Sequence, residues 1–203
     1  MEGYNYNRRI VGCANAPAGA HRTMSQSGLF SHSHTPSKWV ERFADQIPVP
    51  SRVLDVACGA GRHTRLFLAK GHAVTAIDRD LTQIADLHNK QLLRLEADLE
   101  SGAPWPLSKD NFACVIVTNY LYRPILKNLV SNVESGGMLI YETFAEGNEK
   151  YGRPTNPDFL LKPGELLRLV HENLRVIAYE DVTLTHPKTA QIQRIAAFRE
   201  PVR

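Results

Sequence analysis

Residues 53–63 read VLDVACGAGRH and contain the strongest structural signal of the chain. The apolar stretch Arg52–Val56 is typical of a short buried strand, and it places Asp55 near its carboxyl end. Gly59 and Gly61 follow, and glycine lets the backbone turn sharply and approach a ligand without a Cβ in the way. A helix then begins, and its first N–H groups have no partner inside the helix. In open α/β sheets, ligands bind in the crevice beside such a turn.

Strand and helix patterns alternate on both sides of this turn. Strands are predicted at Arg52–Val56, Ala73–Ile77, Leu92–Leu95, Phe112–Val117 and Met138–Glu142. Helices are predicted at Lys38–Ile47, between Gly61 and Gly71, at Leu81–Leu87, from Pro124 to about Val133, and at Gly164–Leu174. Because strands that alternate with helices form crossover units, we expect a parallel sheet with helices on both faces.

The C-terminal end of the chain breaks this alternation. Arg175–Val182 and Gln191–Phe198 read as two strands with no helix between them. We therefore expect them to form an antiparallel pair at one edge of the sheet. The predicted fold class is α/β: a Rossmann-like, doubly wound, mostly parallel seven-stranded sheet with an antiparallel C-terminal edge pair and helices on both faces.

The first 37 residues differ in composition from the rest of the chain. They are rich in Gly, Ser, Asn, Ala and His, and no hydrophobic period runs through them. Such a segment has little apolar surface to bury against its chain entropy. We therefore predict a disordered extension over 1–37 and a single domain over 38–203. His32 and His34 would be solvated in this extension, and contact with a metal ion is the alternative.

The composition excludes several classes of protein. The 203 residues are 43% hydrophobic and 22% charged, as in an ordinary soluble domain, and the formal net charge of +3 gives no electrostatic case for nucleic acid as a partner. No stretch approaches the roughly 20 apolar residues of a membrane span. Cys13, Cys58 and Cys114 lie far apart without C-x-x-C spacing. We therefore expect no disulfide framework, no metal site and a reducing, cytoplasmic compartment.

Three acidic residues end successive predicted strands. Asp55 lies in the first strand, Asp78 follows the second and Asp98 follows the third. The carboxyl ends of parallel strands share one edge of the sheet, so these carboxylates should meet at the ligand crevice. Three of them indicate a ligand with several hydrogen-bond donors, such as ribose hydroxyls, an amine and an exocyclic amino group.

A dinucleotide-binding dehydrogenase is the nearest alternative. Its fingerprint is G-x-G-x-x-G, and here Thr64 stands where the third glycine belongs. Asp55 also precedes the turn directly, where it would repel a pyrophosphate. An acid at that place suits a cationic ligand, and S-adenosylmethionine carries an α-ammonium and a sulfonium but no phosphate.

The segment from Asp55 to Gly61 resembles the first motif of the class I S-adenosylmethionine-dependent methyltransferases, acid-x-Gly-x-Gly-x-Gly, with Ala57 in place of the first glycine. Asp78 matches the acid that closes their second strand. Ala97–Leu99 matches the segment that flanks adenine, and Thr118–Tyr120 matches the end of their fourth strand. Small tellurite-resistance-type and related small-molecule methyltransferases are the most similar members.

The resemblance implies S-adenosylmethionine as the cofactor and S-adenosylhomocysteine as the product. It implies that Asp55 reaches the amino group, Asp78 accepts both ribose hydroxyls and Asp98 accepts the adenine amino group. Arg62 would pair with the methionine carboxylate. The cofactor-binding residues that it implies are Asp55, Ala57, Cys58, Gly59, Gly61, Arg62, Asp78, Arg79, Asp98, Leu99 and Asn119.

Two segments after predicted strands are unusually rich in aromatic and charged residues. One is Asn119–Pro124, and the other runs from Tyr141 to about Pro163. A connection as long as the second is usually functional or disordered, so it is interpreted as a lid or an acceptor-binding wall, with a plain surface loop as the alternative. The candidate acceptor-binding residues are Tyr120, Tyr122, Arg123, Phe144, Tyr151 and Arg153.

Methyl transfer from a sulfonium is an in-line displacement with a good leaving group. An enzyme can therefore act mainly by positioning the reactants and excluding water, and it needs a general base only if the acceptor must lose a proton. Glu142, Tyr120, Tyr122 and His63 are candidate bases, and we single out Tyr122 and Glu142 as catalytic residues.

The sequence favours a small-molecule acceptor over nucleic acid, indicates no membrane partner and leaves the oligomeric state open. Two alternatives to a methyltransferase stay open. One is a non-catalytic, S-adenosylmethionine-binding partner subunit. The other, less favoured, is a nicotinamide-dependent oxidoreductase.

Overall fold

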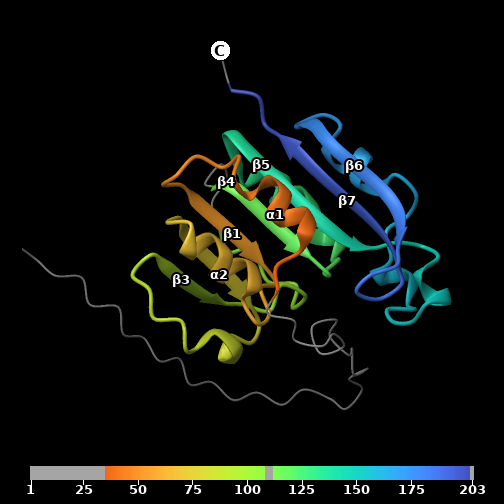
Figure 1. Cartoon of the computed structure of the whole chain (residues 1–203), viewed down its shortest axis with the longest axis horizontal. Coiled ribbons are helices and arrows are strands. Elements are labelled where there is room, and N and C mark those ends of the chain that lie inside the picture. Colours follow the sequence, from red (N-terminus) through yellow and green to blue (C-terminus); the bar gives the residue numbers. More distant parts are fainter. Residues whose placement is uncertain (1–34, 108–111, 202–203) are drawn as a thin grey trace, which may run out of the picture.

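The computed structural model describes residues 35–107 and 112–201. In them a seven-stranded sheet has the order β3-β2-β1-β4-β5-β7-β6 (Figure 1). Its strands are β1 (Arg52–Val56), β2 (Ala73–Asp78), β3 (Leu92–Glu96), β4 (Phe112–Thr118), β5 (Val133–Phe144), β6 (Arg175–Leu184) and β7 (Ala190–Phe198). Strands β1 to β5 are parallel, whereas β7 is antiparallel to both β5 and β6. The predicted fold class and antiparallel edge pair are confirmed.

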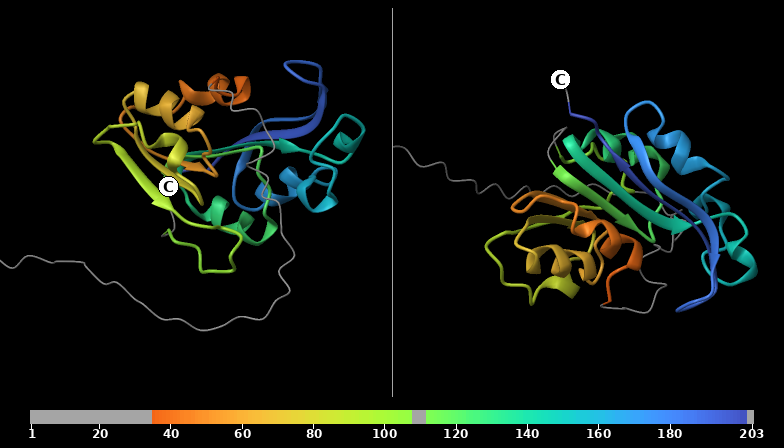
Figure 2. Two further views of the ribbon diagram at one scale, coloured as in Figure 1. Left: turned by 90° about the horizontal axis from the view of Figure 1, so that it is seen from below. Right: turned by 45° about the horizontal axis from the view of Figure 1, so that its top comes forward.

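Helices cover both faces of the sheet (Figure 2). On one face lie α1 (Lys38–Ala44) and α2 (Arg62–Ala69), and on the other lie α3 (Leu126–Ser131) and α4 (Glu165–Val170). Helix α1 begins after Ser37, whose side chain accepts a hydrogen bond from the Trp39 N–H, as a serine N-cap does. The apolar stripes of α1 and α2 bury Trp39 and Phe67 against the sheet, and those of α3 and α4 bury Leu129 and Leu166 on its opposite face.

The predicted helix over Leu81–Leu87 is wrong. The chain forms only a 3-10 turn there, η2 (Thr82–Ile84). The Asp80 carboxylate caps the start of this turn, and the Arg94 guanidinium binds the carbonyl oxygens of Ile84 and Leu87 at its end. A side chain of the following strand, β3, therefore takes the carbonyl groups that a longer helix would have used.

Strand β5 begins five residues earlier than predicted, and Gly136-Gly137 lies inside it rather than in a turn before it. A Cβ on Gly137 would lie 2.9 Å from the carbonyl oxygens of Glu134 and Phe112. Gly137 thus permits close backbone packing between neighbouring strands.

The predicted helices after Pro124 and after Gly164 are shorter than expected, and the first of them opens with a 3-10 turn, η3 (Arg123–Ile125).

The long connection between β5 and α4 packs against the sheet. It contains the 3-10 turns η4 (Asn148–Lys150) and η5 (Pro157–Phe159). Asn148 is buried; its Nδ2 donates to the Pro154 carbonyl at 3.2 Å and its Oδ1 accepts from the Gln191 N–H at 3.2 Å. Buried amide groups of this kind fix the path of a loop, because leaving them unpaired is costly.

Residues 1–34 lie outside the described part of the chain, and so do His32 and His34 of the predicted extension. Within the described ranges, no helix has both the length and the apolar character needed to cross a membrane. The same residues contain no group of three or more His, Cys, Asp or Glu side chains placed to bind a metal ion. Cys58 and Cys114 are buried free thiols.

Candidate functional site

The turn between β1 and α2 exposes backbone at the carboxyl edge of the sheet. Gly59 and Gly61 have φ values of 52° and 69°, in the left-handed region that glycine adopts without strain. Among residues 35–107 and 112–201, a Cβ built on Gly59 would meet no atom within 4 Å, so the backbone there borders space that the described part of the chain leaves open. Ala57 also has a positive φ, 52°, although it carries a Cβ. The backbone of residues 57–61 therefore forms an open turn centred on Gly59, which we call the cradle.

Asp78, at the end of β2, lies against this cradle. Its Oδ2 accepts a hydrogen bond from the Gly59 N–H at 2.8 Å, and its Oδ1 accepts one from the Asp80 N–H at 3.2 Å. The side chain is buried. A carboxylate can accept about four hydrogen bonds, so Asp78 ties two strand ends together and keeps lone pairs for a ligand.

Asp55 is buried beneath the same turn. Its Oδ2 accepts hydrogen bonds from the N–H and the hydroxyl of Thr64, at 2.9 and 2.6 Å. Burial raises the pKa of Asp55 to about 6, although the Thr64 hydrogen bonds and the charge of Arg62 act in the opposite direction. Asp55 thus fixes the first turn of α2 and changes charge just below neutral pH.

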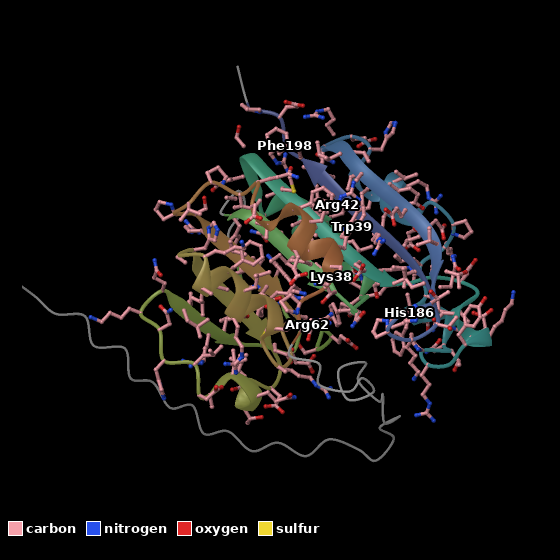
Figure 3. All side chains as sticks on the ribbon, in the orientation of Figure 1. Lys38, Trp39, Arg42, Arg62, His186 and Phe198 are labelled. Carbon is pink, nitrogen blue, oxygen red and sulfur yellow. The ribbon has the colours of Figure 1, made fainter. Side chains whose placement is uncertain are left out.

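Arg62 links the start of α2 to the end of β4, and Asn119 links the end of β4 to β5. Arg62 extends from the start of α2 (Figure 3), and its Nη2 donates to the Thr118 Oγ1 at 3.2 Å. Burial lowers the pKa of Arg62, while the nearby charges of Glu142 and Asp55 raise it. Asn119 has a φ of 54°, and its N–H donates to the Glu142 carbonyl at 2.9 Å. The structure therefore gathers predicted residues from α2 and from the ends of β1, β2 and β4.

The segment after β3 is more open. Asp98 is exposed, and its Oδ1 accepts from the Glu100 N–H at 2.9 Å, whereas Leu99 packs against the core. Arg79 is exposed. Tyr120 is buried, its hydroxyl hydrogen-bonds to the Glu100 carboxylate, and burial raises the pKa of Tyr120. Tyr120 thus links the end of β4 to the segment after β3.

Two candidate bases are held by Ser37, the residue before α1. The Ser37 hydroxyl donates to Glu142 Oε1 at 2.7 Å, and the Ser37 N–H donates to His63 Nε2 at 3.1 Å. Arg194 donates to the other Glu142 oxygen at 3.2 Å. Burial lowers the pKa of His63 to about 3, so the ring stays neutral at physiological pH. Both side chains already take part in fixing the chain that leads into α1.

The other predicted residues fall into two groups. Tyr122 and Phe144 are half-buried at the ends of β4 and β5. Tyr151 and Arg153 are exposed on the β5–α4 connection. Cys58 is buried beside the cradle, and burial together with neighbouring carboxylate charge raises the pKa of its thiol. Cys58 is therefore an unreactive neutral thiol at physiological pH.

Arg123 fastens the β5–α4 connection. Its Nε and Nη2 donate to the two carboxylate oxygens of Glu165, at 2.8 and 3.0 Å. Its Nη1 donates to the Asp158 carbonyl at 2.7 Å and its Nη2 to the Leu160 carbonyl at 2.9 Å. The guanidinium was predicted to bind the acceptor, and the structure instead engages it with the chain itself.

We expect the substitution Arg123→Lys to loosen this connection. Lysine keeps the charge but cannot form the two parallel bonds to Glu165, so the free energy of unfolding should fall by about 1–2 kcal/mol. Amide hydrogen exchange over residues 156–165 should become faster. Arg153→Lys, at an exposed position of the same connection, is the matched control and should change neither quantity. Unchanged exchange in the Arg123 variant would contradict the assigned role.

Four residues that shape the site were given no role in it from the sequence: Ser37, Thr64, Thr118 and Arg194. A serine directly before a helix is an N-cap signal, so Ser37 was detectable as a cap, although its bonds to His63 and Glu142 were not. Arg194 meets Glu142 only because β7 pairs with β5 in this register. No local pattern in the sequence contains that information.

Residues 53–137 match a family model described as a methyltransferase domain. A comparison with curated protein sequences gives no match. Among solved structures, the chain is similar to a SAM-dependent methyltransferase from Methanosarcina mazei, with 12% identity and a TM-score of 0.60 over 83% of this chain and 100% of the other. It is also similar to TehB from Haemophilus influenzae, with 18% identity and a TM-score of 0.60 over 80% of this chain and 61% of the other.

A third similar structure is the 1,6-didemethyltoxoflavin-N1-methyltransferase of Burkholderia thailandensis, solved with bound 1,6-didemethyltoxoflavin and S-adenosylhomocysteine. It shares 16% identity and a TM-score of 0.59 over 80% of this chain and 79% of the other. At these identities, the likeness to solved structures concerns the fold alone.

Proposed function

We propose that this chain, which carries a methyltransferase domain with the class I S-adenosylmethionine-dependent fold, transfers a methyl group from S-adenosylmethionine to a small-molecule acceptor. The observation that carries the proposal is the open cradle at Gly59, bordered by the buried carboxylates of Asp55 and Asp78. The similar methyltransferase that was solved with bound S-adenosylhomocysteine supports the cofactor assignment.

The residues present fit this cofactor. Asp78 offers carboxylate oxygens suited to a ribose diol, and Gly59 leaves free the space that a Cβ would fill. Asp55 and the Asn119 carbonyl suit an ammonium, and the Arg62 guanidinium suits a carboxylate. Asp98 and the Leu99 amide are proposed for the adenine. When bound, the cofactor supplies a methyl group on a sulfonium, an electrophile with a good leaving group.

The protein residues would then act by orientation and by excluding water. Glu142 already accepts hydrogen bonds from Ser37 and Arg194, so we assign it to positioning the segment before α1. Tyr122, half-buried at the end of β4, is our candidate for a proton acceptor where the acceptor must lose a proton. Phe144, Tyr151 and Arg153 are proposed for the acceptor side.

The net charge of +3 supports a small-molecule acceptor rather than nucleic acid. The buried free thiols of Cys58 and Cys114 are in keeping with the reducing cytoplasm as the proposed compartment.

Calorimetric titration of the chain with S-adenosylmethionine, S-adenosylhomocysteine and NADH tests the proposal. Binding of the first two without NADH is the expected result, and it justifies a screen of methyl acceptors. Binding of NADH alone would overturn the proposal in favour of an oxidoreductase. Cofactor binding without turnover of any acceptor in the screen would favour a non-catalytic partner subunit.

The raised pKa of Asp55 predicts a pH dependence of cofactor binding. Only the ionised carboxylate attracts an ammonium, and Asp55 is protonated below about pH 6. The affinity for S-adenosylhomocysteine should therefore be nearly constant above pH 7 and about tenfold weaker at pH 5, since one pH unit below the pKa leaves about a tenth of the carboxylates ionised. Titrations at pH 5, 6, 7 and 8 measure this. In Asp55→Asn the affinity should be lower but independent of pH, and an equal slope in both proteins would contradict the role of Asp55.

A further inference from the structure

A groove of about 700 Å³ lies between α3 and α4, away from the cofactor site. It is lined by Lys127, Val130, Ser131, Arg168, Leu169, His171, Glu172, Asn173 and Arg199. Arg199 pairs through its backbone with Gly136 and Gly137 near the start of β5, so the groove lies toward the amino edge of the central strands. In Figure 1 this edge is near the C-terminus, and the strand ends that carry the aspartates are at the opposite edge. The groove is thus independent of the proposed function.

Positive charge gathers in this groove. Lys127, Arg168 and Arg199 line it together with His171, and Glu172 is the only carboxylate that the described part of the chain contributes to its lining. Among the described residues, none of these three cations forms a salt bridge, whereas Arg123 elsewhere does. Like charges that share a partly enclosed space repel one another, and an anion placed between them relieves that repulsion.

The guanidinium groups of Arg168 and Arg199 each form one hydrogen bond within the described chain and keep further N–H donors. Arg199 Nη2 donates to the Val130 carbonyl at 2.7 Å, and Arg168 Nη1 donates to the Pro163 carbonyl at 2.8 Å. The structure shows no other hydrogen bond from either group to the residues in 35–107 and 112–201, and the Arg199 Nε is buried without a partner. A guanidinium group that donates to a single carbonyl oxygen keeps other N–H groups available for an oxyanion.

The size and charge of the groove point to a class of ligand. Its volume falls within the range of sites for small organic molecules, about 300–1,000 Å³. Two guanidinium groups and an ammonium suit a group with two or more negative charges better than a single carboxylate does. We propose that the groove between α3 and α4 binds a small phosphorylated molecule through Lys127, Arg168 and Arg199.

Calorimetric titration of the full chain with inorganic pyrophosphate tests the proposal. Pyrophosphate has no adenosine that could enter the cofactor site. The double variant Lys127→Gln/Arg168→Gln removes two exposed cations of the groove and should weaken pyrophosphate binding at least tenfold. Lys90→Gln/Lys150→Gln removes the same charge from exposed positions outside the groove and is the matched control, which should bind as the unmodified chain does. Equal affinity in both double variants would overturn the proposal.

Three further titrations distinguish the ligand and the location. Malonate should bind at least tenfold more weakly than pyrophosphate, and equal affinity would overturn the assignment to phosphate. An oligouridylate that binds more tightly than pyrophosphate, and loses affinity in the groove variant, would overturn the small molecule in favour of nucleic acid. Saturation with S-adenosylhomocysteine should leave pyrophosphate binding unchanged, and competition between them would place the pyrophosphate in the cofactor site and overturn the proposal. If S-adenosylhomocysteine does not bind, the proposed function fails, whereas the titrations with pyrophosphate, malonate and oligouridylate still test the groove.

Discussion

Replacing Asp78 by alanine is expected to weaken the binding of S-adenosylhomocysteine by about 100-fold, equivalent to about 2.7 kcal/mol. Two effects add in this variant. The carboxylate proposed to accept the ribose hydroxyls is lost, and hydrogen bonds to a charged group contribute about 1.5–3 kcal/mol each. The Gly59 N–H also loses its acceptor at 2.8 Å, so the cradle is less firmly held.

A second substitution separates these two effects. Asp78→Asn keeps a carbonyl oxygen for the Gly59 N–H but removes the negative charge and one acceptor, so we expect a loss of about 10- to 30-fold. Asp80→Asn, two residues on and exposed, keeps the cap on the N–H of Thr82 and should bind as the unmodified chain does. Calorimetry gives the affinities, and circular dichroism verifies that each variant is folded. Unchanged affinity in Asp78→Ala would remove Asp78 from the proposed site.

The fold was predictable because its main signals are local. Short apolar runs bounded by glycine or acidic residues located β1, β2 and β4 to within a residue, and two adjacent strand patterns at the C-terminus predicted the edge pair. The error at Leu81–Leu87 has a different origin. A helical period was present, but Arg94 of β3 takes the carbonyl groups of that turn, and no local pattern shows such a contact.

The site was predictable to the extent that strand ends determine it. Asp55, Asp78 and Asn119 lie toward one edge of the sheet because parallel strands place their carboxyl ends there. The sequence could not show which polar groups were already engaged. Glu142 was proposed as a base from its place after an apolar run, and its partners Ser37 and Arg194 come from positions 105 and 52 residues away.

The two glycines of the cradle should respond differently to the same substitution. Gly61→Ala places a Cβ 2.4 Å from the Cγ2 of Ile84, a fully buried side chain, at a φ of 69°. Overpacking costs about 1–3 kcal/mol and the left-handed conformation about 1–2 kcal/mol, so the free energy of unfolding should fall by about 2–5 kcal/mol. The Cβ of Gly59→Ala meets no atom of the described residues within 4 Å, so only the conformational cost of about 1–2 kcal/mol applies. Urea unfolding of both variants measures this difference.

Cofactor affinity should show the opposite preference. In Gly59→Ala the new methyl group occupies the open space that we assign to the cofactor, so S-adenosylhomocysteine binding should be lost although the protein loses less stability than Gly61→Ala does. In Gly61→Ala the new methyl group clashes with the Ile84 side chain. Combining it with Ile84→Ala should lower the free energy of unfolding by less than the sum of the two single changes, because alanine at position 84 lacks the Cγ2 atom that clashes. A Gly59→Ala variant that is folded and binds S-adenosylhomocysteine normally would mean that the open cradle is not where the cofactor lies. The two variants together distinguish a glycine that is needed for packing from one that is needed for binding, which the spacing of glycines in the sequence cannot do.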